Sequence, residues 1–403
     1  MTVPTDPPCI VLGLETQIGL AVVRELGRAG VRVIGIAHDS RAIGLHSRYL
    51  TEALTVPEPR SAALLQALRD IGQRHGNCSL LAISEVNLSW LDSHRDALGP
   101  LQAALPDSAA LRWVLDKSRT LQAARAVGIE VPESHDPQSL PEALALRAVL
   151  PYPVVLKWKD PNAVAPLLRA HGLPLLKTEY VHGPEGWDAA ARRYAPLSQW
   201  PMAQRYCPGV GLGQFFFMHR GQAVRRFQHV RVAEWPPEGG FSSVCDAVPL
   251  DAHAGLQELS VRLLQHIGWE GVAMVEYRWD PATGRAVLME INGRFWGSFP
   301  LAVQAGAGFA RLAHAAALGL PLPVLTPPLA PQRCRMLSTE LKRLVRIVLQ
   351  PTRIADPLFQ RRPGHELARF LGDFLRPDVG YYVWSSDDPR PWLRDLSNLV
   401  QGR

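Results

Sequence analysis

The sequence predicts an α/β fold whose first part is an open, mainly parallel sheet. Residues 9–30 read as an apolar strand that passes through a glycine turn into a helix, and 31–37 return as a second apolar strand. A helix at 61–75 and a strand at 79–84 continue the alternation. Strands that alternate with helices indicate a parallel sheet, because each crossover helix returns the chain to the same end of the sheet.

A second unit is predicted to begin near Leu111. A helical pattern at 113–127 is interrupted by Asp116 and Lys117, and Gly128 ends it with Pro132 beyond. The elements expected next are strands at 153–157, 177–181, 201–207, 213–219 and 223–232, helices at 184–194 and 254–268, a loop at 236–243 and a hairpin at 271–292. A Pro-rich linker at 326–331 then leads into a short helical tail.

Length and composition indicate a globular protein. The 403 residues suffice for two or three domains, and 47% hydrophobic with 20% charged residues is typical of folded chains. No stretch approaches the roughly 18 apolar residues of a membrane span, and the N-terminus lacks the features of a signal peptide, so we expect a soluble, cytoplasmic protein. The five cysteines are widely spaced without a CxxC pair, which predicts free thiols.

The net charge of +6 is concentrated at the C-terminal end, where residues 331–403 hold 13 Lys and Arg against 8 Asp and Glu. No nucleic-acid-binding module accompanies this excess, so we interpret it as a solvated basic surface and expect no nucleic-acid partner. One face of the run 341–349 is apolar (Leu341, Leu344, Val345 and Val348). This pattern predicts a helix docked on a core, and contact with a membrane surface is the alternative.

A dinucleotide site at the first glycine turn is a further alternative. Gly13, Gly19 and a following Asp39 loosely match the pattern of a nicotinamide-dependent oxidoreductase. The glycines are too far apart for the tight turn that lets a backbone approach a pyrophosphate. The spacing therefore disfavours this interpretation.

The hairpin at 271–294 has one apolar face and one face that carries carboxylate, amide and guanidinium groups. In its second strand, alternation places Glu290, Asn292 and Arg294 on one face and an apolar set (Val287, Met289 and Ile291) on the other. A turn at the middle of the hairpin places Glu276 opposite Glu290, where two carboxylates repel each other unless a cation neutralises them. Carboxylate and amide oxygens suit Mg²⁺. The alternative is a solvated strand face with an ion pair to Arg294.

Two lysines and one strand end supply groups that a nucleotide needs. Lys117 and Lys157 place ammonium groups where they can meet phosphates. The segment Gln204-Arg205-Tyr206-Cys207 runs into a turn, where backbone groups can pair with an adenine edge.

The order of these motifs resembles the ATP-grasp superfamily, in its branch of carbamoyl-phosphate synthetase-like and carboxylate-amine ligases. The match covers roughly 12–318 and comprises an Asp-Lys pair at 116–117, a Tyr-Pro-Val-Val-Leu-Lys strand at 152–157, a Gln-Arg-Tyr-Cys-Pro-Gly hinge at 204–209 and the hairpin that ends in Glu-Ile-Asn-Gly-Arg at 290–294. The resemblance implies a Rossmann-like pre-ATP-grasp domain at 1–110, a two-lobed ATP-grasp domain at 111–325 and a basic helical extension at 326–403. The lobes would divide near residue 200.

The resemblance also implies a role for each matching residue. Lys117 and Lys157 would bind ATP phosphates, and the four residues 204–207 would meet adenine. Mg²⁺, or Mn²⁺ in its place, would be held by Glu276, Glu290 and Asn292. Arg294 would act in catalysis by steadying the transferring phosphoryl group.

The carboxylate substrate of relatives enters beside an Arg-rich strand and a Gly-Gly-x-Ser-Ser turn. In this sequence the corresponding candidates are His229, Arg231 and Ser242, because a guanidinium fork and turn N–H groups both suit an anion. The alternative, without a role in binding, is an exposed strand beside a mobile loop.

Two departures from the family pattern concern the nucleotide. The segment 158–165, where relatives carry a glycine-rich phosphate loop, contains no glycine, and 208–213 lacks the acidic residue that often binds the ribose. We expect an ATP-dependent ligase that joins a small-molecule carboxylate to an amine, with release of ADP and phosphate. A non-amine nucleophile and a non-catalytic nucleotide-binding protein are the alternatives, and a homodimer is left open.

Overall fold

The computed structural model describes residues 7–176, 178–327, 332–354, 356 and 359–401. The chain divides into two compact units. The first collects Met1–Ser108, Gly213–Met274 and Asn292–Arg403, and the second consists of Ala109–Leu212 and Val275–Ile291. The domain boundaries expected near 110 and 325 follow the order of the sequence and stay a prediction.

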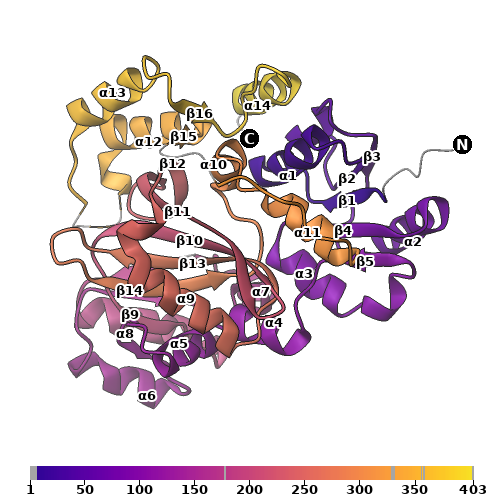
Figure 1. Ribbon diagram of the computed structural model, residues 1–403. Helices are drawn as coiled ribbons and strands as arrows, with labels where there is room; N and C mark the ends of the chain where they lie inside the picture. Colours follow the sequence, from indigo (N-terminus) through magenta and orange to yellow (C-terminus); the bar gives the residue numbers. More distant parts are fainter. Residues whose placement is uncertain (1–6, 177, 328–331, 355, 357–358, 402–403) are drawn as a thin grey trace, which may run out of the picture. The chain divides into compact units, whose positions relative to one another are not determined.

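The first unit contains a five-stranded parallel sheet of order β3-β2-β1-β4-β5 (Figure 1). Its elements are β1 (Cys9–Leu12), α1 (Gln17–Arg28), β2 (Val33–Ala37), β3 (Glu52–Thr55), α2 (Ala62–His75), β4 (Cys78–Ala82), α3 (Glu85–Asp92) and β5 (Leu101–Ala103). This arrangement confirms the parallel sheet that the alternating pattern predicts.

Both faces of this sheet are buried, since successive strand residues point to opposite sides. Ile10 and Leu12 pack with apolar residues of α2 and α3. Cys9 and Val11 pack with α1 and with two helices from much later in the chain, α10 (Phe299–Gln304) and α11 (Phe309–Ala317). The N-terminal sheet is therefore completed by residues from the third stretch of the first unit.

The glycine turn after β1 serves close packing. Gly13 has φ of +110°, and a Cβ added to Gly19 would lie 2.0 Å from the Gly13 carbonyl oxygen. Gly19 thus lets α1 pack directly on the strand-to-helix turn, which gives this glycine pair a structural reason.

The second unit contains a four-stranded antiparallel sheet of order β6-β9-β7-β8. Its elements are α4 (Ser108–Leu115), α5 (Lys117–Ala126), β6 (Ser134–His135), α6 (Leu140–Ala145), β7 (Val154–Lys157), α7 (Pro161–Ala170), β8 (Glu179–Val181), α8 (Pro184–Tyr194) and β9 (Met202–Arg205). The predicted strand at 177–181 begins on residue 177, which lies outside the described residues. Helix α7 is not among the predicted elements.

A seven-stranded sheet has the order β14-β13-β10-β11-β12-β15-β16. Its strands are β10 (Val210–His219), β11 (Gln222–Trp235), β12 (Phe241–Ala247), β13 (Gly271–Trp279), β14 (Ala286–Asn292), β15 (Arg333–Arg335) and β16 (Val379–Tyr381), and α9 (Ala254–His266) lies between β12 and β13 in sequence. Strands β10, β13 and β14 each run across the boundary between the two units. The loop expected at 236–243 is shorter than predicted, because β12 starts at Phe241.

The tail is not purely helical, which corrects the prediction. It contains α12 (Leu337–Leu349), α13 (Pro363–Gly372) and α14 (Arg390–Val400), but β15 pairs antiparallel with β12 and β16 pairs parallel with β15. Cys334 lies opposite Cys245 in this register, and both are fully buried. Across the described residues, no helix is long and apolar enough to cross a membrane.

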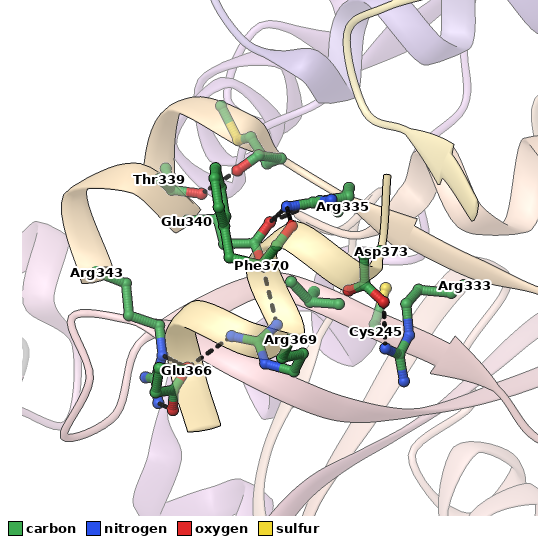
Figure 2. A network of polar contacts seen from close by, with 12 residues as sticks. Cys245, Arg333, Arg335, Thr339, Glu340, Arg343, Glu366, Arg369, Phe370 and Asp373 are labelled. Carbon is green, nitrogen blue, oxygen red and sulfur yellow. Dashed lines mark hydrogen bonds and ion pairs between the residues drawn. The ribbon is translucent and has the colours of Figure 1, made fainter. Parts of the chain in front are cut away.

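The predicted orientation of α12 is wrong. Leu341, Val345 and Val348 are exposed and Leu344 is half-buried, whereas Glu340 and Arg343 are buried. The reason is a network of ion pairs beneath the helix (Figure 2). Buried charges are tolerated where they are paired and hydrogen-bonded, and this network supplies both kinds of partner.

Arg335 is the centre of that network. Its guanidinium lies 2.7 Å from Glu340, with both side chains at most 1% exposed (Figure 2). It also lies over the rings of Phe370 and Phe374. Further pairs join Glu340 to Arg369 at 3.0 Å, Glu366 to Arg343 at 2.8 Å and Glu366 to Arg369 at 2.7 Å. These bonds fasten α12 and α13 to each other and to β15.

Candidate functional site

Five charged side chains of the second unit form an electrostatic cluster around Lys157. Lys157 ends the buried strand β7, Lys117 begins α5, and Glu276, Arg278 and Glu290 come from β13 and β14. The charges of the other four all act on the Lys157 ammonium group. The structure thus brings together four residues that the sequence analysis singled out, and it adds Arg278.

The pKa of Lys157 reflects opposing effects of the charges in this cluster. Desolvation of its ammonium group lowers the pKa of Lys157 below the ordinary lysine value, and the neighbouring cations Lys117 and Arg278 lower it further. Glu290 and Glu276 act in the opposite direction. Three cations beside two carboxylates leave an excess of positive charge, which an anionic ligand would neutralise.

Lys117 is positioned by the start of α5. Asp116 caps the helix, since its carboxylate accepts hydrogen bonds from the N–H groups of Ser118 at 2.8 Å and Arg119 at 3.2 Å. The Lys117 N–H donates to the carbonyl of Lys159, and its Nζ lies 2.7 Å from Glu290 Oε2. The interruption that the sequence shows at 116–119 is therefore the boundary between α4 and α5, and it places a predicted phosphate ligand beside a predicted metal ligand.

The hinge residues lie on β9 and just after it. Gln204 is buried, and its side-chain amide donates to Ser134 Oγ at 3.2 Å. The N–H groups of Arg205 and Tyr206 donate to the carbonyls of Glu133 and Pro153. A role for 204–207 in binding adenine stays a prediction, and these bonds show which backbone donors already hold the sheet together.

Close to this hinge, Cys207 and Gly209 have distinct environments. Burial raises the pKa of the Cys207 thiol, although the nearby cations Arg285 and Lys157 oppose this effect. Gly209 has φ of +119°, and a Cβ there would lie 2.5 Å from the Trp279 carbonyl oxygen, so the turn after β9 requires glycine.

The segment without glycine after Lys157 folds into a helix. Asp160 caps α7 by accepting hydrogen bonds from the N–H groups of Asn162 at 2.9 Å and Ala163 at 3.0 Å, and Pro161 occupies the first turn. The place where the resemblance implies a flexible phosphate loop is thus taken by helical residues.

Strand β14 departs from the simple alternation that the sequence suggests. Leu288 is fully buried and Met289 is only half-buried, while Val287 and Ile291 are buried as predicted. The Leu288 N–H also donates to the carbonyl of Glu130. Both sides of the strand are therefore covered in part, and Glu290 is half-buried.

Asn292 and Arg294 belong to the first unit and contact each other. Arg294 Nη2 donates to Asn292 Oδ1 at 2.8 Å, its Nη1 donates to the Phe295 carbonyl at 3.0 Å, and its Nε lies 3.4 Å from Glu85 Oε1. Asn292 follows Glu290 by two residues on the same strand. No sequence pattern marked Glu85 as a site residue, because only the fold brings it close to Arg294.

The three predicted substrate residues lie on β11 and β12 of the first unit. His229 is fully buried, and its pKa lies well below the ordinary histidine value because of burial and the charge of Arg231. Arg231 Nη1 donates to Glu234 Oε1 at 2.8 Å and to the Gly240 carbonyl at 2.9 Å. Ser242 Oγ donates to the Val244 carbonyl at 3.1 Å. Their role in substrate binding stays a prediction.

Close packing surrounds His229. Its ring meets Phe215 edge-on with 4.8 Å between centroids, and a Cβ on Gly213 would lie 2.9 Å from its Nε2. Phe215 in turn stacks on Trp296 at 4.0 Å. Trp296 is a residue of this packing that the sequence analysis missed. The sequence analysis also missed Arg278 beside Lys157, although Arg278 shares a strand face with Glu276 at a spacing of two.

Comparison with known proteins shows that the chain has the ATP-grasp fold, which confirms the fold that the motifs predicted. Among solved structures it is similar to biotin carboxylase from Campylobacter jejuni (TM-score 0.62, 14% identity, 82% of this chain and 75% of that chain). It is also similar to L-amino acid ligase from Bacillus licheniformis (TM-score 0.58, 15% identity, 78% of this chain and 75% of that chain).

Sequence comparison gives a consistent but partial match. The chain is 26% identical over 211 residues to D-alanine–D-alanine ligase of Cereibacter sphaeroides. The matched region is 51% of this chain and 61% of that relative, so the chain spans about three fifths of the length of the curated relatives it matches. No protein-family model matches the sequence.

Proposed function

We propose that this protein is an ATP- and Mg²⁺-dependent ligase that converts a carboxylate into an acyl phosphate and joins it to an amine. The observation that carries the proposal is the cluster of Lys117, Lys157 and Arg278 beside Glu276 and Glu290. Two of the similar proteins are named as ligases of amino acids, which supports an amino acid or peptide as the nucleophile.

Phosphate binding is the first role of the cluster. An ammonium group in a desolvated position gains most from an anion, because Coulomb attraction is stronger where water is excluded. Lys157 is such a group, and the partly exposed pair of Lys117 and Glu290 can separate at little cost. ATP phosphates would take Glu290's place on Lys117.

The donor set fits a divalent cation. The predicted ligand oxygens of Glu290 and Asn292 each already contact a cationic nitrogen, of Lys117 and Arg294 respectively, so both attract positive charge. Among the described residues no group of three His, Cys, Asp or Glu forms a metal cluster, and a site with two carboxylates and one amide leaves positions for water and phosphate oxygens, as Mg²⁺ prefers. When bound, the metal would neutralise charge on the transferring phosphate. Mn²⁺ would use the same oxygens.

The remaining residues position the reactants. Arg294 would steady the transferring phosphoryl group with its guanidinium, and Arg231 would orient the carboxylate, with His229 and Ser242 as further contacts. The carboxylate oxygen attacks the γ-phosphorus and ADP leaves; the amine then attacks the acyl carbon, loses a proton and expels phosphate. Positioning and charge neutralisation account for this chemistry, as in other phosphoryl transfers.

A second candidate is favoured by one observation. Helix α7 replaces the phosphate loop that the resemblance implies. This replacement suits a divergent protein that binds a nucleotide without catalysing a reaction. A non-amine nucleophile is a variant of the leading proposal. We place the protein in the cytoplasm, which fits its five free cysteines, and a homodimer is compatible with the proposal.

The test is ADP release with ATP, Mg²⁺ and a panel of small carboxylates and amines. We expect release to need both a carboxylate and an amine, to be lost in Lys157→Met and to persist in Lys159→Met. Lys159 is a matched control, because it neighbours the cluster in sequence but pairs with Asp136 at 3.0 Å. Nucleotide binding without any release would favour the second candidate, and release that needs no amine would point to another nucleophile.

A further inference from the structure

Helix α12 presents its apolar face to the outside. Its buried side consists of Thr339, Glu340, Arg343 and Ile347, and its exposed side consists of Leu341, Lys342, Val345, Val348 and Leu349. An amphipathic helix on a globular protein normally buries its apolar stripe. This helix does the reverse, since its charged residues enter the network around Arg335 (Figure 2).

Helix α13 repeats the arrangement. Glu366 and Arg369 pair inward with Arg343 and Glu340, while four large apolar residues in the helix and just after it are exposed: Leu367, Leu371, Phe374 and Leu375. Leu375 is 88% exposed and Leu349 on α12 is 73% exposed. The two helices contact each other and lie side by side in the first unit (Figure 1).

The exposed charges of the same region are almost all positive. Between residues 337 and 378, the exposed cations among the described residues are Lys342, Arg353, Arg361, Arg362 and Arg376. The exposed acid in that described range is Asp378, which is paired with Arg376. We call the exposed apolar residues of α12 and α13, together with these cations, the tail surface.

We propose that the tail surface binds an anionic lipid bilayer. Apolar side chains flanked by Lys and Arg on helices that lie in the membrane plane are the combination that inserts into the boundary between headgroups and acyl chains, with the cations near anionic phosphates. The ion network keeps both helices attached to the protein, so the apolar residues stay outward when the surface is not bound. The partner is defined by charge as well as by apolar area, and a gathering of exposed large apolar residues on two helices in contact indicates an interaction site.

Charge distinguishes a bilayer from a second copy of the chain. A symmetric dimer through this surface would bring the same cations of two copies together, and like charges across an interface oppose binding. An anionic membrane instead attracts every one of them. The positive charge therefore favours the lipid surface.

The test is co-sedimentation of the full chain with phosphatidylcholine vesicles, with or without phosphatidylglycerol, at low and at raised salt. We expect binding to the vesicles that contain phosphatidylglycerol, weakened by salt. The double variant Leu349→Glu/Leu375→Glu should lose this binding, and both sites are exposed enough to leave the fold intact. Arg362→Ala should weaken it roughly fivefold.

Val324→Glu is the matched control, because Val324 is 98% exposed in the same unit but lies outside the tail surface. It should bind like the parent protein. Absence of sedimentation with both kinds of vesicle, or equal sedimentation with both, would overturn the proposal. A dimer in solution that the double variant abolishes would assign the surface to a second copy instead.

Discussion

Lys117 and Glu290 form an ion pair in the second unit, with 2.7 Å between Nζ and Oε2. Both side chains are partly exposed, at 20% and 32%, so the pair contributes little to folding. Its significance is chemical, since one partner is the predicted phosphate ligand and the other the predicted metal ligand. Under the proposed function, a nucleotide and a cation would separate the two charges.

Replacing Glu290 should separate activity from stability. We expect Glu290→Gln to change the free energy of unfolding by less than about 1 kcal/mol, because an exposed ion pair is worth little. ADP release should fall by roughly a hundredfold or more, since charge on the transferring phosphate would lose a neutralising ligand. Thermal unfolding without nucleotide and a coupled ADP assay measure the two effects.

The control for this variant is Glu130→Gln. Glu130 also forms an exposed ion pair in the second unit, with Arg285. This variant should keep its ADP release. If Glu290→Gln turned over at the parental rate, Glu290 would not be an essential ligand, and if it unfolded without nucleotide, its role would be structural.

The products should be ADP and phosphate. Transfer of the γ-phosphoryl group to a carboxylate releases ADP, whereas adenylation would release AMP and pyrophosphate. Chromatography of the nucleotides after turnover distinguishes the two reactions. AMP formed in proportion to the ligated product would contradict the acyl-phosphate mechanism.

Glu340 should be essential for the stability of the first unit. Its carboxylate is buried between Arg335 and Arg369, so Glu340→Gln leaves buried positive charge without its main partner. We expect a loss of about 3–5 kcal/mol in urea unfolding. Arg74→Gln removes an exposed pair with Glu52 in the same unit and should cost less than about 1 kcal/mol. Similar losses in both variants would show that burial of the network does not matter.

Glu25 should make stability depend on pH. Burial raises the pKa of Glu25 to about 7, although the Arg311 N–H donates to its Oε1 at 2.9 Å. The folded protein therefore holds this proton at pH values where the unfolded chain, with an ordinary pKa of 4.5, has released it. The contribution of Glu25 to the unfolding free energy is fully present below pH 4.5. It is lost as the pH rises through 7, by about 3 kcal/mol in total.

The measurement is the difference in unfolding free energy between the parent protein and Glu25→Gln from pH 5 to pH 8. Glutamine keeps an oxygen for the Arg311 N–H but cannot ionise, so the variant should gain stability relative to the parent as pH rises. A difference that does not change with pH would show that Glu25 titrates normally in the fold.

Short sequence patterns predicted the helix and the strand that hold the candidate site residues. Asp116 is a helix-capping residue, so its position marks the start of α5 and places Lys117 at a helix N-terminus. The apolar run before Lys157 predicts a buried strand that ends on a cation, as β7 does. The family resemblance named Lys117 and Lys157 as phosphate ligands and Glu290 as a metal ligand, and the structure brings the three side chains together.

Contacts between distant segments were beyond local patterns. The apolar spacing of α12 predicts that Leu341 and Val348 face a core, but Arg335 and Glu366 supply ion partners that turn the opposite face inward. The absence of glycine after Lys157 was visible in the sequence, whereas the helix α7 in its place depends on the cap at Asp160.

The way that α10 and α11 complete the N-terminal sheet has a consequence for biosynthesis. All five strands of that sheet leave the ribosome before either helix has been translated, so the face that includes Cys9 and Val11 lacks part of its apolar cover during elongation. The whole second unit is translated between β5 and α10 and can fold meanwhile, because domains generally fold as units during synthesis. One apolar face of the strands that are made first is therefore expected to stay partly uncovered until α10 and α11 have been synthesised.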